Sequence, residues 1–288
     1  MKIITDARCL EYHRTGHPER PQRVAAGAAK LKSQTVFPVD WLGPVAVPDE
    51  MILRAHTAAH LDSLSQSEDF DGDTPAYPEI AQHARRSVGA ALHAQQLAAR
   101  GEIVFSLIRP PGHHATKNQA MGFCYLNNVA IAALEARASG FKKVAVFDFD
   151  VHHGNGTEDI LLDRDGLAFY SIHQWPAYPG SGQSHRGKNC FNYPVAPDSP
   201  SSTYRAACTE AVQQLGVFGP DMIAVSAGFD SYRGDPLCQQ NMEPADFHWL
   251  GKSIRNLGVP SFSLLEGGYS KDLPELIFAY LRGLNGLA

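Results

Sequence analysis

The sequence has little cysteine, no excess of basic residues and no long apolar run, and each absence excludes a class of protein. Its five cysteines are odd in number and scattered, without a C-x-x-C spacing, which argues against a disulfide framework and against a zinc site built from thiolates. The formal net charge is -5, so the chain offers no basic footprint for nucleic acid and no polybasic patch for a membrane surface. We therefore expect neither a nucleic acid nor a membrane as a partner.

No apolar stretch approaches the run of about 20 residues needed to span a bilayer. The N-terminal segment 1–6 has one lysine and a short apolar run that an aspartate ends, unlike a secretion signal. We therefore expect a cytoplasmic protein. With 288 residues, of which 44% are hydrophobic, the chain can bury a full core, and nothing in it marks a linker, an internal repeat or a low-complexity tract.

Histidine is more abundant than a chain of this size needs, and it concentrates in two pairs, at 113–114 and 152–153. The second pair closes the segment V-A-V-F-D-F-D-V-H-H-G-N-G at 144–156, in which apolar residues interleaved with acids predict a buried strand that runs into a polar loop. Side chains two apart in an extended segment point the same way, so Asp150 and His152 can bind one ion together. Carboxylate and imidazole ligands without a thiolate suit a divalent ion such as zinc or ferrous iron.

Apolar strands alternate along the chain with helices of ten or more residues. The expected strands are 3–5, 103–108, a segment beginning at 144, 167–172, 222–226 and 261–265. The expected helices are 24–32, 80–100, 129–138, 203–215, 244–256 and 273–284. This alternation predicts an α/β protein with a central, mostly parallel sheet and helices on both of its faces.

Polar clusters follow four of the expected strands, and in parallel sheets ligands bind beyond the carboxyl ends of the strands. These clusters are His113 and His114, the segment 148–153, Asp230, and Tyr269 after a Gly-Gly pair. We therefore expect them to form one site.

In this site Asp150, His152 and Asp230 are the natural metal ligands, and a water on the ion would make the protein a hydrolase. The two histidines would act as general base and acid, with Asp148 accepting a ring N–H, and Tyr269 would donate to a developing oxyanion.

Five motifs then occur in order: R-P-P-G-H-H, G-F-C-Y-L-N-N, D-F-D-V-H-H-G-N-G, A-G-F-D-S-Y-R-G-D-P and L-E-G-G-Y. Together they resemble the histone deacetylase and acetylpolyamine amidohydrolase family, within the arginase-like deacetylase superfamily, and the likeness covers nearly the whole chain. The resemblance implies one catalytic domain, residues 1–288, with the arginase-like α/β fold. It also implies removal of an acyl group from an amine by a metal-bound water, with zinc, or ferrous iron in the cell, as the cofactor.

The resemblance assigns roles residue by residue. It implies the metal ligands Asp150, His152 and Asp230. It implies the catalytic residues His113, His114 and Tyr269, with Asp148 orienting His113. For a narrow acyl-lysine tunnel it implies Gly122, Phe123, His173 or a neighbour of His173, Leu237, the rim acid Asp73, and Arg23 at the foot. For a structural potassium ion it implies Asp148, Asp150, His152, Ser171 and Ile172. From spacing alone Arg23 would instead be a surface or capping residue.

Two positions bear on the branch and the substrate. Asn155, the expected partner of His114, is typical of the class II branch, where class I members carry an acid. Leu237 stands where the polyamine-specific eukaryotic branch has a glutamate, and a leucine cannot select a cationic amine. We therefore expect a bacterial-type, class II-like lysine deacetylase, acting on an acetylated protein or peptide. The alternative substrate is an acetylated polyamine, because the acidic stretch 68–73 would favour either cation.

Two other functions are weighed against this one. A ureohydrolase shares the fold but holds two manganese ions with additional acids, and A-G-F-D-S-Y-R-G-D-P offers Asp230 alone near the metal, with Asp235 farther along the loop. A non-catalytic acyl-lysine binder would not need the whole catalytic set. The physiological substrate, the acyl chain length, the native metal and the oligomeric state stay open at this point.

Overall fold

The computed structural model describes all residues from 1 to 288, and they form one α/β domain around a single eight-stranded sheet. Every pairing in the sheet is parallel, in the order β2-β1-β3-β8-β7-β4-β5-β6. The strands are β1 Lys2–Ile4, β2 Asp40–Leu42, β3 Val104–Ser106, β4 Val144–Asp148, β5 Leu167–Gln174, β6 Cys190–Val195, β7 Met222–Ala227 and β8 Ser261–Leu265. The expected α/β fold is confirmed, and the sheet is parallel throughout instead of mostly parallel.

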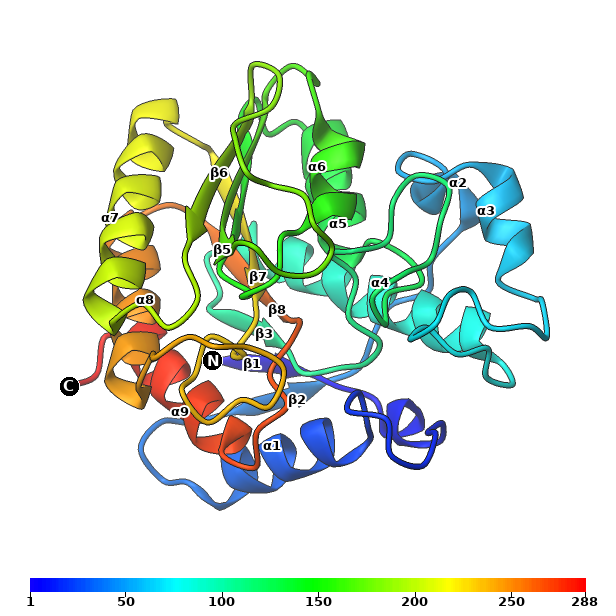
Figure 1. The fold of residues 1–288 in the computed structure, drawn as a ribbon, viewed down its shortest axis with the longest axis horizontal. Coiled ribbons are helices and arrows are strands. Elements are labelled where there is room, and N and C mark those ends of the chain that lie inside the picture. Colours follow the sequence, from blue (N-terminus) through cyan, green and yellow to red (C-terminus); the bar gives the residue numbers. More distant parts are fainter.

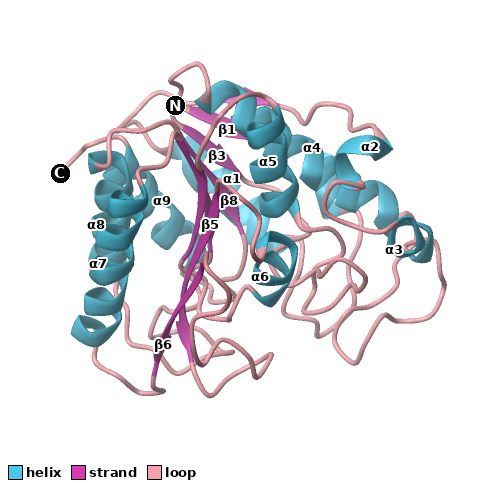
Figure 2. Cartoon of the chain, turned by 90° about the horizontal axis from the view of Figure 1, so that it is seen from above, coloured by secondary structure: helices cyan, strands magenta, loops and turns pink.

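Helices cover both faces of this sheet. They are a 3-10 helix at Ala7–Leu10, α1 Gln22–Ser33, α2 Asp49–Ile52, α3 Ala58–Ser63, α4 Ile80–Ala98, α5 Asn128–Ala138, α6 Asn155–Leu161, α7 Ser201–Phe218, α8 Pro244–Asn256 and α9 Leu273–Leu284. Figure 2 shows the sheet nearly edge-on, with α7, α8 and α9 on one side and α4, α5 and α6 on the other. Helix α1 packs on α9, and α2 and α3 lie at the opposite end of the molecule from α7 (Figure 1).

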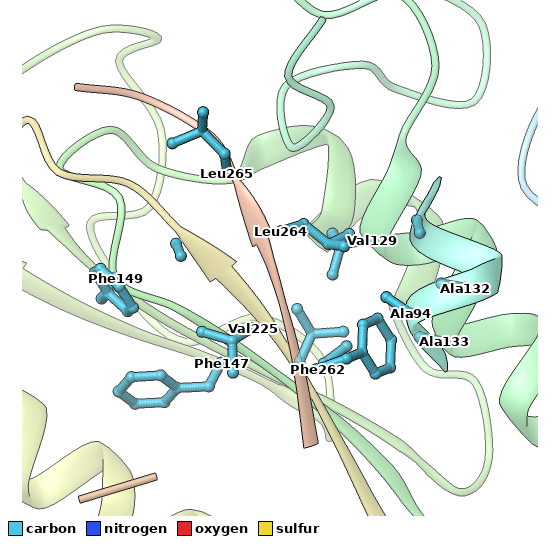
Figure 3. Close-up of a cluster of buried hydrophobic side chains, with 14 of the residues drawn as sticks. Ala94, Val129, Ala132, Ala133, Phe147, Phe149, Val225, Phe262, Leu264 and Leu265 are labelled. Carbon is cyan, nitrogen blue, oxygen red and sulfur yellow. The ribbon is translucent and has the colours of Figure 1, made fainter. Parts of the chain in front are cut away.

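The core lies on both faces of the central strands. All five residues of β4 are buried, as are those of β7, so these strands have no solvent-facing side. In Figure 3, Phe262 and Leu264 of β8 point toward the alanine-rich helices α4 and α5, while Phe147 and Phe149 point away from them. Burying one such side chain stabilises the fold by about 1.5–3 kcal/mol. The sheet is therefore a rigid support for whatever its carboxyl ends carry.

Six elements were not expected from the sequence: the 3-10 helix, α2, α3, α6, β2 and β6. Strand β6 falls in what reads as a long loop because Pro194 interrupts its pattern, but β6 is the last strand of the sheet, where a missing N–H is tolerated. Strand β2 at the other edge has only three residues, too few to show a pattern. Helix α6 begins at Asn155, where G-N-G predicts only a turn. None of the helices is both long and apolar enough to cross a membrane.

Candidate active site

Four neighbouring strands, β3, β8, β7 and β4, end at the same edge of the sheet. Each is followed by a segment carrying a predicted site residue: Gly112 to His114 after β3, Tyr269 after β8, Asp230 after β7, and Asp150 with His152 after β4. The expected convergence of the four strand ends is therefore what the fold produces. His113, His114, His152 and Tyr269 line one cavity, and Asp150 and Asp230 lie beside His152.

Asp150, His152 and Asp230 form a candidate metal centre, with one ligand atom from each lying within 4.8 Å of the others. The Nδ1 atom of His152 lies 3.3 Å from Asp150 Oδ1 and 3.1 Å from Asp230 Oδ2. Burial works to lower the pKa of His152, but the two carboxylates outweigh it and raise that pKa to about 10. Two fully buried carboxylates that share one imidazole carry an excess of negative charge. A divalent cation suits both this charge and the oxygen and nitrogen donors.

The backbone of the Gly-Gly pair passes directly against this centre. Gly267 donates its N–H to Asp150 Oδ2 at 2.7 Å. A Cβ atom at Gly267 would collide with the carboxylates of Asp230 and Asp150, so no larger residue fits there. Gly268 has a φ of 114°, a backbone angle that residues other than glycine rarely adopt. Gly267 therefore lets the backbone approach the carboxylates closely, and Gly268 lets the chain turn immediately before Tyr269.

The two histidines of the pair have different partners. The Nδ1–H of His113 donates to Asp148 Oδ2 at 3.1 Å, and that of His114 donates to Asn155 Oδ1 at 2.7 Å. Burial opposes protonation of His113, but Asp150 and Asp148 outweigh it and raise its pKa to about 10. The pKa of His114 lies well below its ordinary value because of burial and the neighbouring histidines. The surrounding carboxylates thus favour protonation of His113, whereas burial favours the neutral form of His114, whose ring centroid lies 4.0 Å from that of His113.

Tyr269 is held by contacts on its ring and its backbone. Its N–H donates to Asp235 Oδ2 at 2.6 Å, the Arg23 guanidinium lies 4.7 Å from its ring centroid, and Phe123 meets it edge-on at 5.8 Å. Burial raises the pKa of its phenol well above the ordinary value. Tyr269 therefore keeps its O–H proton at neutral pH and can donate it as a hydrogen bond.

A cavity of about 210 Å³ connects these groups to the surface. Its lining residues are Asp73, Pro111, His113, His114, Gly122, Phe123, His152, Tyr178, Leu237, Gly267 and Tyr269. Gly122, Phe123, Leu237 and Asp73 thus lie where the sequence predicts tunnel residues. Gly122 has a φ of 57° and faces the His114 ring, 2.5 Å from where its Cβ would lie, so the wall can approach this closely only at a glycine.

Two predicted tunnel positions differ in the structure. His173 is fully buried inside β5, where its Nε2 faces the carbonyl oxygen of Gly182 at 3.0 Å, and the wall residue is Tyr178, five positions later, which meets the ring of His114 edge-on at 5.1 Å. Arg23 does not line the cavity but lies behind Tyr269, where it donates to the backbone oxygens of Gly268 and Glu266. It is buried, so it is not the surface or capping residue that spacing alone suggests.

The positions expected to hold potassium lie side by side. Asp148 and Ser171 are register partners on β4 and β5. Asp148 Oδ1 accepts the N–H of Asp150 at 3.1 Å, the Ser171 hydroxyl lies 2.9 Å from His173 Nδ1, and the Ile172 oxygen accepts the hydroxyl of Tyr204 at 2.8 Å. The potassium site itself stays a prediction.

Two buried acids of the site were not identified from the sequence as site residues. Glu266 accepts the N–H groups of Gly112 at 2.7 Å and His113 at 3.2 Å, and so fixes the backbone of the histidine pair. Asp235 holds Tyr269, as described above. The only sequence signal for either is an acid beside a glycine, at a strand end for Glu266 and in a loop for Asp235, because both act on backbone groups of distant segments.

Known proteins with similar sequences and structures are deacetylases and amidohydrolases. The family described as "Histone deacetylase domain" matches residues 17–282. A probable deacetylase of Methanothermobacter thermautotrophicus is 38% identical over 99% of this chain and 91% of its own length. Acetylpolyamine amidohydrolase 1 of Pseudomonas aeruginosa is 32% identical over 88% and 86%. The crystal structure of the HDA15 HD domain superposes with a TM-score of 0.92 at 33% identity, covering 99% of this chain and 91% of that one. The chain belongs to the histone deacetylase and acetylpolyamine amidohydrolase family, and is a hydrolase of the deacetylase type.

Proposed function

We propose that the protein is a metal-dependent amidohydrolase that removes an acetyl group from the side-chain amine of lysine in a protein or peptide. One observation supports this above the others: His152 of the metal triad, both histidines of the pair and Tyr269 line the same cavity of about 210 Å³. A metal ligand, two proton-transfer groups and a hydrogen-bond donor therefore face the same cavity. The metal is zinc, or ferrous iron in the cell, because the ligands are two carboxylates and one imidazole.

When bound, a divalent ion supplies Lewis acidity and lowers the pKa of water in the open position. The protein's own residues do the rest. Neutral His114 accepts a proton, and Asn155 keeps its ring oriented. Cationic His113, fixed by Asp148, is the group able to donate a proton to the leaving amine. Tyr269 donates its O–H to the developing oxyanion from the far wall.

The cavity wall suits an aliphatic side chain that ends in an amide. Phe123 packs edge-on against His17 at 4.7 Å and against Tyr269, so the ring is fixed in the wall where it can flank a methylene chain. Asp73 lies at the cavity and can accept a backbone N–H of a peptide substrate. Leu237 adds no charge to this wall. The absence of a charge at position 237 favours an acetyl-lysine substrate over a polyamine.

An acetylated polyamine is the second candidate substrate. It is supported by relatives named acetylpolyamine amidohydrolase in Pseudomonas aeruginosa and Mycoplana ramosa, and by the acids Asp71 and Asp73 at the rim. The deciding experiment compares kcat/KM of the zinc-loaded protein on an acetyl-lysine peptide, acetylputrescine and acetylspermidine. Preference for the peptide by tenfold or more, about 1.4 kcal/mol in the transition state, supports our proposal. The reverse preference replaces it with polyamine deacetylation.

We also propose a structural cation and weigh two other functions. A structural potassium ion held by Asp148, Asp150, His152, Ser171 and Ile172 would neutralise the acids behind the metal. The two-manganese alternative has little support, since the chain has one cluster of three ligands and Asp235 bonds to the backbone instead of joining it. A non-catalytic binder is disfavoured by the intact set of ligands, histidines and tyrosine. We place the protein in the cytoplasm on the sequence argument alone.

The role of Tyr269 has its own test. Tyr269→Phe should retain the metal and lose on the order of 3 kcal/mol of transition-state stabilisation, a drop of about 100-fold in kcat. An unchanged rate would mean that Tyr269 is not the oxyanion donor.

A further inference from the structure

We infer that Asp235 is the positioning residue of Tyr269, and that its carboxylate ties the catalytic tyrosine and the cavity-wall residue Leu237 into one unit. This inference rests on the proposed function, since it assigns to Asp235 a role that acts through the Tyr269 hydroxyl. Asp235 touches neither the cavity nor the metal triad. It is nevertheless buried, with 6% of its surface exposed.

The carboxylate of Asp235 accepts three backbone N–H groups. Its Oδ2 accepts from Tyr269 at 2.6 Å and from Ser270 at 3.2 Å, and its Oδ1 accepts from Leu237 at 3.0 Å. No side chain donates to it. A buried carboxyl group left without hydrogen-bond partners would be costly, and the three N–H groups supply these partners. Asp235 therefore holds two loops together through their main chains.

The first of these loops needs such an anchor. Gly267 and Gly268 precede Tyr269, and glycines leave the backbone free to adopt many conformations. The peptide group between Gly268 and Tyr269 is held at both ends, since its C=O accepts from Arg23 Nε at 2.7 Å and its N–H donates to Asp235. This pair of bonds fixes the plane of the peptide and hence the direction in which the Tyr269 side chain leaves the backbone.

The second loop ends at the cavity wall. Leu237 lines the cavity and is 41% exposed, so packing alone does not hold it in place. Its N–H is bound by the same carboxylate that holds Tyr269. The spacing between the wall at Leu237 and the hydroxyl donor at Tyr269 is thus set by one side chain. This explains an acid at position 235 that the metal does not use.

A double-mutant cycle tests the inference. Asp235→Asn keeps the shape of the side chain but turns one acceptor into an NH₂ group that faces an N–H donor. In the wild-type background we expect Asp235→Asn to lower kcat ten- to 100-fold. In the Tyr269→Phe background, where no hydroxyl remains to be misplaced, it should lower kcat less than twofold further. Metal content should stay at one ion per chain in all four proteins.

Two comparisons complete the design. Asp235→Glu keeps the charge but moves it by one methylene, and it should show the same non-additivity. Asp272→Asn is the matched control, because it changes a carboxylate near the same loop. This carboxylate accepts a hydrogen bond only from the Tyr232 hydroxyl and none from the backbone, so kcat should stay within twofold.

The outcomes separate the inference from the proposed function. An unchanged rate in Tyr269→Phe alone overturns the role of Tyr269 in the proposed function. A normal Tyr269→Phe effect with equal losses from Asp235→Asn in both backgrounds overturns the role of Asp235 and leaves the proposed function standing. Loss of metal, or failure of both Asp235 variants to fold, also overturns it, because a positioning residue leaves the metal centre intact.

Discussion

His114 donates its Nδ1–H to the amide oxygen of Asn155 at 2.7 Å, whereas its neighbour His113 donates to the carboxylate of Asp148 at 3.1 Å. The rings of these two histidines lie 4.0 Å apart, and one has a neutral amide as its hydrogen-bond acceptor where the other has a carboxylate. The carboxylates raise the pKa of His113 against its burial, and burial holds the pKa of His114 well below its ordinary value. One histidine is ready to donate a proton and the other to accept one.

Asn155→Asp should therefore change the pH dependence of the reaction. The substitution is nearly isosteric and places a negative charge beside His114, which raises its pKa. Because His114 must be neutral to accept a proton, the acid limb of kcat/KM against pH should move to higher pH. A profile identical to that of the wild type would contradict the assignment of His114 as the proton acceptor.

Gly267→Ala should destroy the metal centre. The added methyl group would collide with the carboxylates of Asp230 and Asp150, and those carboxylates cannot move without leaving the ligand positions. We expect loss of bound metal by elemental analysis together with loss of activity. Gly216→Ala is the matched control, since a Cβ there meets nothing within 4 Å, and it should bind metal normally. Full metal occupancy in Gly267→Ala would show that the backbone does not approach the ligands this closely.

Leu237→Glu should shift the substrate preference toward polyamines. A carboxylate on the cavity wall would attract the cationic chain of acetylspermidine, and a charge pair at a partly exposed site is worth about 1 kcal/mol. We expect the ratio of kcat/KM for acetylspermidine to that for an acetyl-lysine peptide to rise about fivefold. Leu237→Gln, similar in size without the charge, should leave the ratio near the wild-type value. Equal ratios in both variants would mean that position 237 does not contact the substrate.

Three buried neutral histidines contribute stability that is lost as the solution becomes acidic. Burial lowers the pKa of His56 and of His173 to about 3, and it lowers that of His60. Between pH 6.5 and about 3 these three histidines bind more protons in the unfolded chain than in the folded one, so the stability that they contribute declines as pH drops through this window. His56 accepts the N–H of Asn127 and donates to the oxygen of Thr116.

His56→Gln tests this account because glutamine can both accept and donate but does not titrate. Its free energy of unfolding should change less than that of the wild type between pH 7 and pH 5, measured by denaturant titration. His13→Gln, at an exposed histidine, should follow the wild type. The same pH slope in all three proteins would show that His56 takes up no proton on unfolding.

The sequence predicted those parts of the structure that depend on local pattern. The long strands and helices follow from apolar periodicity, and the site follows because parallel strands end at one edge. Strand β6 was not predicted because Pro194 interrupts its apolar pattern. A proline is tolerated there only because β6 lies at the edge of the sheet. The roles of Asp235 and Glu266 were not predicted because these acids bind backbone N–H groups 34 and 154 residues away, and no local sequence pattern indicates such a contact. The place of Tyr178 in the cavity wall was not predicted because this residue lies in a long loop, and the path of the loop depends on its tertiary contacts.

The central claim is that one divalent ion, held by Asp150, His152 and Asp230, is needed for amide hydrolysis. It is tested most directly by stripping the protein of metal with a chelator and adding zinc back in known amounts, while acetate release from an acetyl-lysine peptide is measured. We predict no turnover in the stripped protein and full recovery at one zinc per chain. Undiminished turnover after stripping, or recovery only at two ions per chain, would contradict the account.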